Sequence, residues 1–184
     1  MFVVFLNIFE DEANIFCNIA NLICSDFLKI FIGDENEIKN YCSFFSGLLK
    51  NYLDKIEKHF SKLEISPQLY IVPWFEELFT RTLSYKILLR VFDLYLINGE
   101  IVLYQTSLAI LNILEEDLLN VTINDVFKIL ERFPENVPEN DLIGKIRDYS
   151  CIKKEFFASK LENELAAQKS DLFEIILSIF FSSI

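Results

Sequence analysis

The sequence predicts an all-α fold, and three observations support it. Hydrophobic residues make up 52% of the 184 residues, which is enough for one domain with a sizeable core. The chain has only 4 glycines and 4 prolines, and the strict polar–apolar alternation of half-buried strands is rare. Apolar residues instead recur at three- and four-residue spacing, the period of amphipathic helices. We therefore expect a single all-helical domain, a helical bundle, over residues 1–184.

The first part of the chain predicts helices separated by one clear break. Residues 1–9 have the composition of the end of a helix, and the acids at 10–12 suit the positive end of a helix that runs to about Phe31. A turn is expected at 33–36. One long amphipathic helix should then extend from Glu37 to about Ser61, with the apolar positions Tyr41, Phe44, Phe45, Leu48, Leu49, Tyr52, Leu53 and Ile56.

The next helix has a strong start signal in Ser66 and Pro67. Serine caps a helix, and proline suits the first helical position because its missing N–H costs nothing there. Pro73 follows six residues later, so we expect this helix to be bent or divided at that point. An apolar stripe follows, consisting of Trp74, Phe75, Leu78 and Phe79.

Two strongly apolar helices are expected on either side of Gly99. Ser84 can cap a helix over about 85–98, Gly99 suits its C-terminal end, and a further helix should run from Glu100 to about Leu114. Both helices are apolar nearly all round, which predicts a hairpin buried at the centre of the bundle. The charged residues among them disfavour a membrane location.

The last part predicts shorter helices and a C-terminal extension. Thr122 and Asp125 form a capping pattern for a helix to about Phe133. A loop lies between Pro134 and Pro138, and one charged amphipathic helix should cover about 141–168. Residues 151–184 form the expected extension, whose apolar end, 172–184, is too short to span a bilayer.

Composition and charge exclude several functions. The formal net charge is −11 and no basic face is visible, which argues against nucleic-acid binding. The four cysteines have no metal-ligand spacing, so buried free thiols are favoured for Cys17 and Cys24. His59 has no catalytic partner nearby in sequence and is expected to face solvent or the last carbonyls of its helix. We therefore expect no metal site. The isolated glycines form no phosphate-binding loop, so no nucleotide or other cofactor is expected.

Ordered motifs over about residues 10–150 carry a family resemblance. The first is an acidic and then aromatic helix opening at 11–22, and the second, at 65–79, contains Pro67, Tyr70, Trp74 and Phe75. Leu89-Arg-Val-Phe-Asp93 and a Gly99-led helix follow in order. Together these resemble the C-terminal half of the TBC domain, the catalytic domain of Rab GTPase-activating proteins. The resemblance implies the C-terminal lobe of that all-α domain.

The resemblance also implies a function and a partner. The partner would be a Rab-type small GTPase that itself carries GTP and Mg²⁺, in membrane traffic, so the chain would be cytoplasmic or peripheral on endomembranes. The chain would regulate a GTPase rather than be an enzyme. The family uses an arginine finger in I-x-x-D-x-x-R and a glutamine in Y-x-Q-G-M. Neither motif occurs in this sequence, so no catalytic residue is assigned and a catalytically incomplete activator is expected.

Four residues are candidates for partner binding, namely Trp74, Phe75, Arg90 and Asp93. Each also has a structural interpretation. Arg90 and Asp93 lie three apart on a helix expected to be mostly buried, so they can form an internal ion pair. Trp74 and Phe75 at helical spacing suit a core, although tryptophan is also a common interface anchor. The structural interpretation is favoured for all four.

Other hypotheses stay open at this stage. The chain can be a catalytically dead TBC-like module that binds a GTPase or acts as a scaffold, a helical scaffold unrelated to GTPases, or a peripheral membrane protein. Met1 lies near the place of the family's Y-x-Q-G-M, which suggests either a start assigned inside a longer gene or a reduced protein. A half-domain should expose apolar surface, so we expect self-association or a need for a partner.

Overall fold

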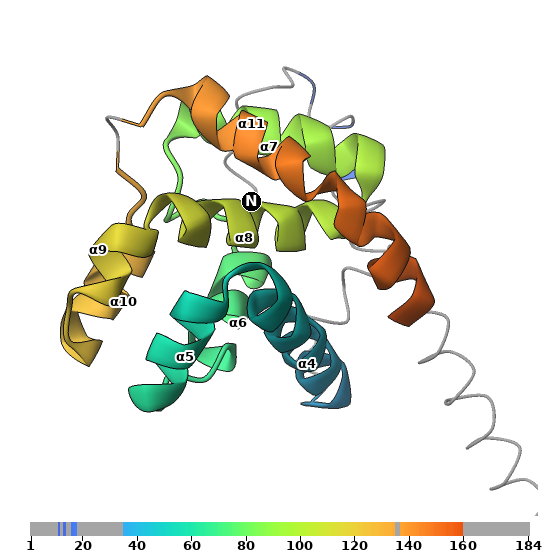
Figure 1. Ribbon diagram of the computed structural model, residues 1–184. Helices are drawn as coiled ribbons and strands as arrows, with labels where there is room; N and C mark the ends of the chain where they lie inside the picture. Colours follow the sequence, from blue (N-terminus) through green and yellow to red (C-terminus); the bar gives the residue numbers. More distant parts are fainter. Residues whose placement is uncertain (1–10, 12, 14–15, 18–34, 135–136, 160–184) are drawn as a thin grey trace, which may run out of the picture. The chain divides into compact units, whose positions relative to one another are not determined.

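The described part of the chain is helical and contains no strand. The structure, a computed structural model, describes residues 11, 13, 16–17, 35–134 and 137–159. Its helices are α4 (Glu35–Tyr52), α5 (Asp54–Lys62), α6 (Gln68–Glu76), α7 (Tyr85–Asn98), α8 (Ile101–Ile113), α9 (Glu115–Leu119), α10 (Ile123–Glu131), α11 (Glu139–Asp148) and the 3-10 turn η1 (Tyr149–Ile152) (Figure 1). The all-α prediction is confirmed.

The chain divides into two compact units, Met1–Ser150 and Cys151–Ile184. The first unit contains α4 to α11 and all the motifs that the sequence singled out between 65 and 111. The helices expected at 1–31 and the apolar end at 172–184 lie outside the described residues, apart from the isolated positions 11, 13 and 16–17. Within the described part, no helix is both long and apolar enough to cross a membrane. The prediction of a single domain stays a prediction.

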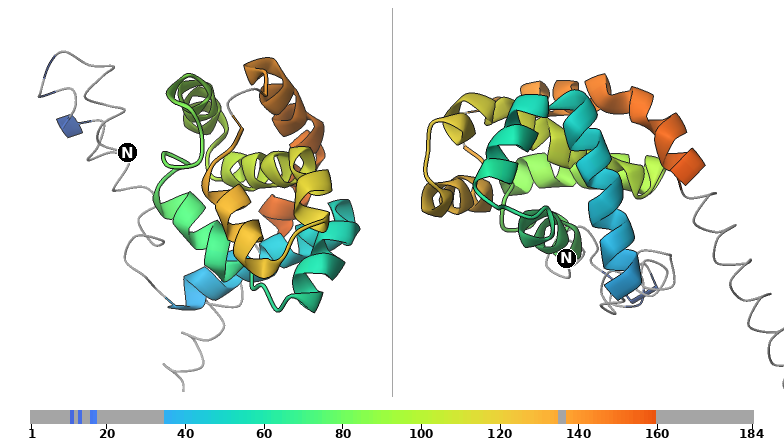
Figure 2. Two further views of the ribbon diagram at one scale, coloured as in Figure 1. Left: turned by 90° about the vertical axis from the view of Figure 1, so that its left-hand side faces the viewer. Right: turned by 60° about the horizontal axis from the view of Figure 1, so that its bottom comes forward.

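Helix α8 is the centre of the first unit. Every side chain from Ile101 to Leu111 is buried. In Figures 1 and 2, α8 runs between α7 and α11 on one side and α4 and α6 on the other, and it is in contact with all four. A helix that is apolar all round can be stable in water only if neighbours cover every face, which is the arrangement found here.

Two of the three buried polar side chains of α8 are hydrogen-bonded to backbone carbonyls. Gln105 donates from Nε2 to the Tyr149 carbonyl oxygen at 3.1 Å, and Ser107 Oγ donates to the Leu103 carbonyl at 2.9 Å. The Thr106 hydroxyl is buried without a hydrogen-bond partner among the described residues. Buried polar atoms of this kind cost free energy unless bonded, so the two bonds let a helix with polar residues occupy the core.

Helix α7 corrects the prediction of a hairpin buried on every side. Its range agrees with the expectation, but only one face is buried, formed by Ile87, Leu88, Val91, Phe92 and Tyr95. The opposite face is exposed to solvent. Sequence composition alone could not show this, because both faces of α7 carry large apolar residues.

The long helix predicted over 37–61 is divided in two. Leu53 adopts φ −136° and ψ 49°, which is not helical, and separates α4 from α5. Its side chain is buried, and the two helices diverge from this point in Figure 1. Because Leu53 N–H still donates to the Leu49 carbonyl at 2.8 Å and its own carbonyl accepts from Glu57, the break loses little hydrogen bonding.

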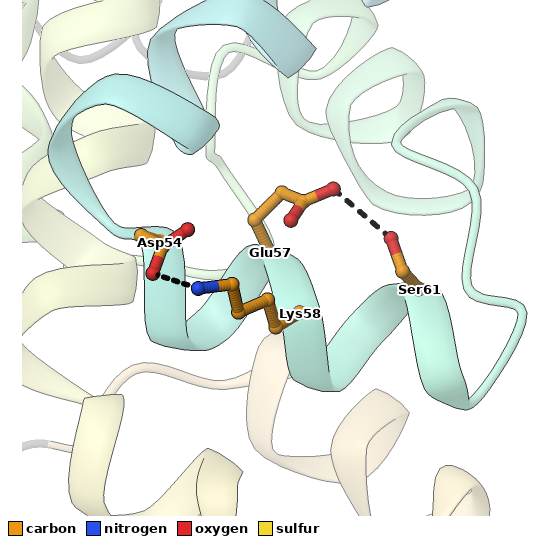
Figure 3. Close-up of polar contacts among 4 residues, drawn as sticks. All are labelled: Asp54, Glu57, Lys58 and Ser61. Carbon is orange, nitrogen blue, oxygen red and sulfur yellow. Dashed lines mark hydrogen bonds and ion pairs between the residues drawn. The ribbon is translucent and has the colours of Figure 1, made fainter.

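The exposed side of α5 carries local polar pairs. Lys58 Nζ contacts Asp54 Oδ2 at 2.6 Å, and Ser61 Oγ donates to Glu57 Oε1 at 3.0 Å (Figure 3). Both pairs are spaced by four residues and lie in solvent, so they contribute little to stability. They mark the outer surface of α5, while Ile56 and Phe60 form its buried side.

Helix α6 begins as the sequence predicted. The Ser66 hydroxyl oxygen accepts from the Gln68 N–H at 3.3 Å, and Pro67 adopts a helical conformation directly before Gln68. Pro73 lies inside the helix without dividing it, since α6 continues to Glu76. The carbonyl that Pro73 leaves without its usual donor belongs to Leu69, an exposed residue, so water can hydrate it.

The end of α6 is unusual because large residues replace glycine. Phe79 N–H donates to the Trp74 carbonyl at 2.9 Å and Leu78 N–H to the Phe75 carbonyl at 3.1 Å, the bond pattern of a Schellman motif. Leu78 has φ 50° and Phe79 φ 60°, a left-handed conformation that costs a side-chain-bearing residue about 1–2 kcal/mol. Both side chains are buried. Their burial offsets that cost.

Gly99 ends α7 in the expected way, with φ 74° and its N–H bonded to the Tyr95 carbonyl at 2.7 Å. Replacing it by alanine should lower the free energy of unfolding by about 1 kcal/mol, because no atom lies near an added Cβ and only the backbone is strained. The matched control is Gly47→Ala in α4, where space is also open. There alanine should stabilise the chain by about 0.5–1 kcal/mol. Urea denaturation measures both, and equal shifts would contradict the role given to Gly99.

The last described helices place one predicted cap residue as expected and correct one range. Thr122 occupies the N-cap position of α10, but its hydroxyl donates to Asp125 Oδ2 at 2.9 Å and caps no backbone N–H. The single helix expected over 141–168 is wrong within the described residues. Helix α11 ends at Asp148, and η1 follows before a helical stretch at 153–159.

Candidate functional site

Trp74 and Phe75, two of the predicted partner-binding residues, lie in the core. Trp74 Nε1 donates to the carbonyl oxygen of Leu130 at 3.3 Å and so ties α6 to α10. Phe75 packs edge-on against Tyr104 of α8, with ring centroids 5.1 Å apart. Both side chains are buried, as their structural interpretation expects. A direct contact of these two residues with a partner stays a prediction.

Arg90 and Asp93 lie on the exposed face of α7, which corrects the expectation of a mostly buried pair. Arg90 Nη1 donates to Glu139 Oε1 at 2.8 Å and thus pairs with α11 rather than with Asp93. The two residues of the predicted pair are three positions apart, but the Glu139 carboxylate is the acid placed within bonding distance. Their role in partner binding stays a prediction.

Glu139 binds a second base, Lys86, whose Nζ lies 3.1 Å from Oε2. The Glu139 carboxylate is mostly shielded from solvent, while Lys86 and Arg90 remain exposed. The three residues form ion pairs that connect α7 to α11. Glu139 is also the first residue of α11, where a negative charge is favoured by the helix dipole. Glu139 was not predicted from the sequence, since it lies 49 residues from Arg90 and belongs to none of the motifs.

Replacing Glu139 by glutamine should lower the free energy of unfolding by about 1 kcal/mol. The charge-assisted bond to Arg90 is lost, while the exposure of the bases keeps the effect small. A double-mutant cycle with Arg90→Gln, followed by urea denaturation, measures the coupling. Additive effects of the two substitutions would show that the ion pair contributes nothing.

The same face of α7 carries exposed apolar side chains. Tyr85 is 48%, Leu96 64% and Ile97 79% exposed. Single exposed apolar residues are ordinary, but here three lie on one helix beside Lys86 and Arg90. We use the name α7 face for Tyr85, Lys86, Arg90, Asp93, Leu96 and Ile97.

The other three arginines are exposed, whereas the two glutamines that the structure describes differ in burial. Arg81 is exposed and pairs with Glu77 at 3.1 Å, and Arg132 and Arg147 are exposed as well. Gln105 is buried in α8 and bonded to a backbone carbonyl, so it cannot orient a water molecule in a partner's active site without leaving the core. Gln68 is exposed at the start of α6.

Buried tyrosines occur in α6, α7 and α8, and their environment suppresses ionisation. Burial raises the pKa of Tyr70, Tyr95 and Tyr104. The Tyr70 hydroxyl is buried without a partner among the described residues, whereas Tyr41 donates its hydroxyl to Glu100 Oε1 at 3.2 Å. The phenols of Tyr70, Tyr95 and Tyr104 therefore stay neutral at physiological pH, and they serve packing rather than acid–base chemistry.

Among the described residues, the thiols and His59 show no arrangement for catalysis. Cys17 and Cys151 are exposed and form no disulfide, so the expectation of a buried thiol is wrong for Cys17, while Cys24 lies outside the described residues. Burial raises the pKa of the half-buried Cys42. His59 lies in the last turn of α5, but its Nε2 is shielded and has no hydrogen-bond partner among the described residues, contrary to the expected solvent-facing ring. In the same part of the chain, no cluster of three His, Cys, Asp or Glu could hold a metal.

Comparison with known proteins gives the family. The chain matches the Rab-GTPase-TBC domain model over residues 1–119. It is 30% identical over 145 residues to TBC1 domain family member 12 of Xenopus tropicalis, which covers 78% of this chain and 21% of that protein. It is 29% identical over 140 residues to Drainin of Dictyostelium discoideum, covering 76% and 32% of the two chains.

A third relative is TBC1 domain family member 14 of Homo sapiens, with 28% identity over 145 residues that cover 78% of this chain and 21% of that protein. The chain therefore spans about a fifth to a third of the length of these relatives. The matched region includes α6, α7 and α8, which carry the motifs of residues 65–111. This chain belongs to the Rab-GTPase-TBC domain family.

Proposed function

We propose that the chain is a TBC-type regulator of a Rab-type small GTPase. The observation that carries this proposal is the family match over residues 1–119, joined to the packing of the motif helices α6, α7 and α8 in one unit. In this proposal the GTPase binds GTP and Mg²⁺, and the regulator provides the protein surface that contacts the GTPase. Arg90 and Asp93 on the α7 face are the residues proposed to touch the partner, with Trp74 and Phe75 supporting α6 from within the core.

The proposed regulator is catalytically incomplete as a 184-residue chain. Stimulation of a GTPase needs a cation that stabilises charge on the transferring phosphoryl group and a group that positions the attacking water. The four arginines stand outside the family's finger motif. Gln105 is buried and bonded. The chain is therefore proposed to act on the GTPase as a regulator and not as an enzyme with a substrate of its own.

The alternative is a TBC-like module that binds a GTPase, or another protein, as a scaffold without changing its rate. Either function is compatible with a cytoplasmic chain brought to endomembranes by its GTPase partner.

Exposed Leu96 and Ile97 also support the proposal that the chain self-associates or needs a partner. Light scattering on the purified chain over a range of concentrations tests self-association, and a constant monomer mass would reject it.

Binding to GTPases tests the proposed function directly. We would titrate the chain into a panel of fluorescently labelled Rab-type GTPases, each loaded either with GDP or with a non-hydrolysable GTP analogue. The expected result is saturable binding to at least one GTPase, tighter in the GTP-analogue form. Arg90→Gln should weaken this binding, while Arg81→Gln, which removes another exposed and ion-paired arginine, should not. Failure of the whole panel to bind would overturn the proposal.

A further inference from the structure

A carboxylate of α11 restricts the guanidinium of Arg90 on α7. Glu139 Oε1 accepts a hydrogen bond from Arg90 Nη1 at 2.8 Å, and the two residues belong to helices that lie side by side (Figure 1). The side chain of Glu139 is 15% exposed and that of Arg90 is 46% exposed. Because the N–H donors of a guanidinium form a rigid planar fork, a short charge-assisted bond at one of them limits the directions in which the others can point.

The Glu139 carboxylate is itself held in place. Lys86 Nζ lies 3.1 Å from Oε2, so each carboxylate oxygen has its own base, and the group cannot rotate far without weakening both contacts. Glu139 is also the first residue of α11, where the helix dipole favours its charge. Helix α11 packs against both α8 and α7. Glu139 is therefore a fixed acceptor and not a surface acid that follows the motion of Arg90.

Most donors of Arg90 stay available to a partner. A guanidinium has five N–H donors, and among the residues that the structure describes Arg90 donates only to Glu139. The four charges in this area balance, because Lys86 and Arg90 are matched by the acids Asp93 and Glu139. This part of the α7 face therefore offers a partner donors of fixed direction, and no net charge.

We propose that Glu139 is a positioning residue, which holds Arg90 in the orientation that binds the Rab-type GTPase. The inference rests on the proposed function, in which Arg90 touches the GTPase. A flexible arginine loses side-chain freedom when it binds a partner, and an arginine already held by its own chain loses less. The bond to Glu139 should therefore strengthen binding by about three- to tenfold.

The opposite effect, in which Glu139 masks Arg90 from the partner, is physically weaker. The Arg90 side chain is nearly half exposed, so water screens the charge of the carboxylate. Glu139 also occupies only one of the N–H groups of Arg90. Removing the carboxylate thus loses more in orientation than it gains in free charge. Tighter binding of the GTPase by Glu139→Gln would show that masking dominates and would overturn the inference.

The first test is a double-mutant cycle on affinity. The probe is a GTPase that the full chain binds, loaded with a non-hydrolysable GTP analogue. Glu139→Gln should raise the Kd by about three- to tenfold, and Arg90→Gln by at least as much. Combining the two should weaken binding no further than Arg90→Gln alone, because Glu139 acts only through Arg90. If Glu139 merely stabilised the fold, it would lower the affinity equally with and without Arg90, and that result would reject the positioning role.

A matched control comes from another ion pair of the same kind. Glu77 Oε1 lies 3.1 Å from Arg81 Nε, outside α7, so Glu77→Gln also removes an acid that pairs with an exposed arginine. This variant should leave the affinity for the GTPase unchanged. Circular dichroism confirms that every variant is folded before its affinity is measured. An equal loss in Glu77→Gln and Glu139→Gln would mean that the effect is not specific to Arg90.

A second measurement needs no partner. NMR of the arginine side-chain nitrogens in the free chain reports how fast each guanidinium rotates. Rotation of the Arg90 guanidinium should be slow in the unmodified chain and should become faster in Glu139→Gln, because its fixed acceptor has lost its charge. Rotation of Arg81 should be the same in both chains. Equally fast rotation of Arg90 with and without the carboxylate would overturn the inference.

Failure of this inference is distinguishable from failure of the proposed function. If a GTPase binds the unmodified chain and Glu139→Gln equally well, the proposed function stands and the positioning role fails. The same holds if Arg90→Gln leaves the affinity unchanged. If no GTPase of the panel binds, the proposed function fails, and the positioning role fails with it.

Discussion

Replacing Trp74 by alanine will lower the free energy of unfolding by about 3–5 kcal/mol, the range typical of large buried aromatic residues. The indole is buried, its ring centroid lies 5.6 Å from that of Tyr70 and 5.7 Å from that of Phe79, and Nε1 donates to the Leu130 carbonyl. Removal leaves a cavity and an unpaired carbonyl between α6 and α10. Urea denaturation followed by circular dichroism measures the change.

A matched substitution separates the two contributions of Trp74. Phenylalanine keeps most of the ring volume and loses the donor to Leu130, so Trp74→Phe should cost only about 1–2 kcal/mol. A loss below about 1 kcal/mol for Trp74→Ala would mean that the indole is not packed in the core. That result would favour the interpretation of Trp74 as an interface anchor.

The second large effect concerns catalysis. A GTP-loaded Rab-type GTPase mixed with the 184-residue chain is expected to hydrolyse GTP at its intrinsic rate. An arginine finger contributes about three to five orders of magnitude in rate, and none of the four arginines stands in the finger motif. Single-turnover phosphate release measures the rate, with a TBC domain that contains both finger motifs as the positive control.

An acceleration of more than about a hundredfold would contradict this expectation, because binding alone does not supply such a factor. The variants Arg81→Gln, Arg132→Gln and Arg147→Gln, all at exposed positions, would then show which side chain acts as the finger. Arg90→Gln belongs in the same series, since its ion pair with Glu139 leaves donors available.

Local signals in the sequence predicted most helix boundaries between 66 and 131. Ser66 and Pro67 start α6, Gly99 ends α7, and Thr122 with Asp125 starts α10. Each signal works through groups only a few residues apart, such as a hydroxyl that accepts a nearby N–H or a glycine that adopts positive φ. Such interactions are the same whatever the rest of the chain does, which is why the sequence reveals them.

Other features depend on packing between distant segments. The break at Leu53 and the left-handed Leu78 and Phe79 run against local preference, and each carries a buried side chain. Burying a large apolar side chain is worth about 1.5–3 kcal/mol, which exceeds the local backbone cost. No local sequence pattern predicts these backbone conformations, because the neighbours that bury these residues come from elsewhere in the chain.

The features of the candidate site also fall into two groups, those that the sequence predicts and those that depend on the tertiary structure. The sequence by itself determined the family motif, the position of Arg90 and Asp93 on one helix, and the apolar character of α7 and α8. Only the tertiary structure decided that α8 is buried on all sides while α7 is buried on one, and that Arg90 and Lys86 bind Glu139. The physical reason is that exposure and ion pairing depend on which helices lie alongside, and α11 reaches α7 only through folding.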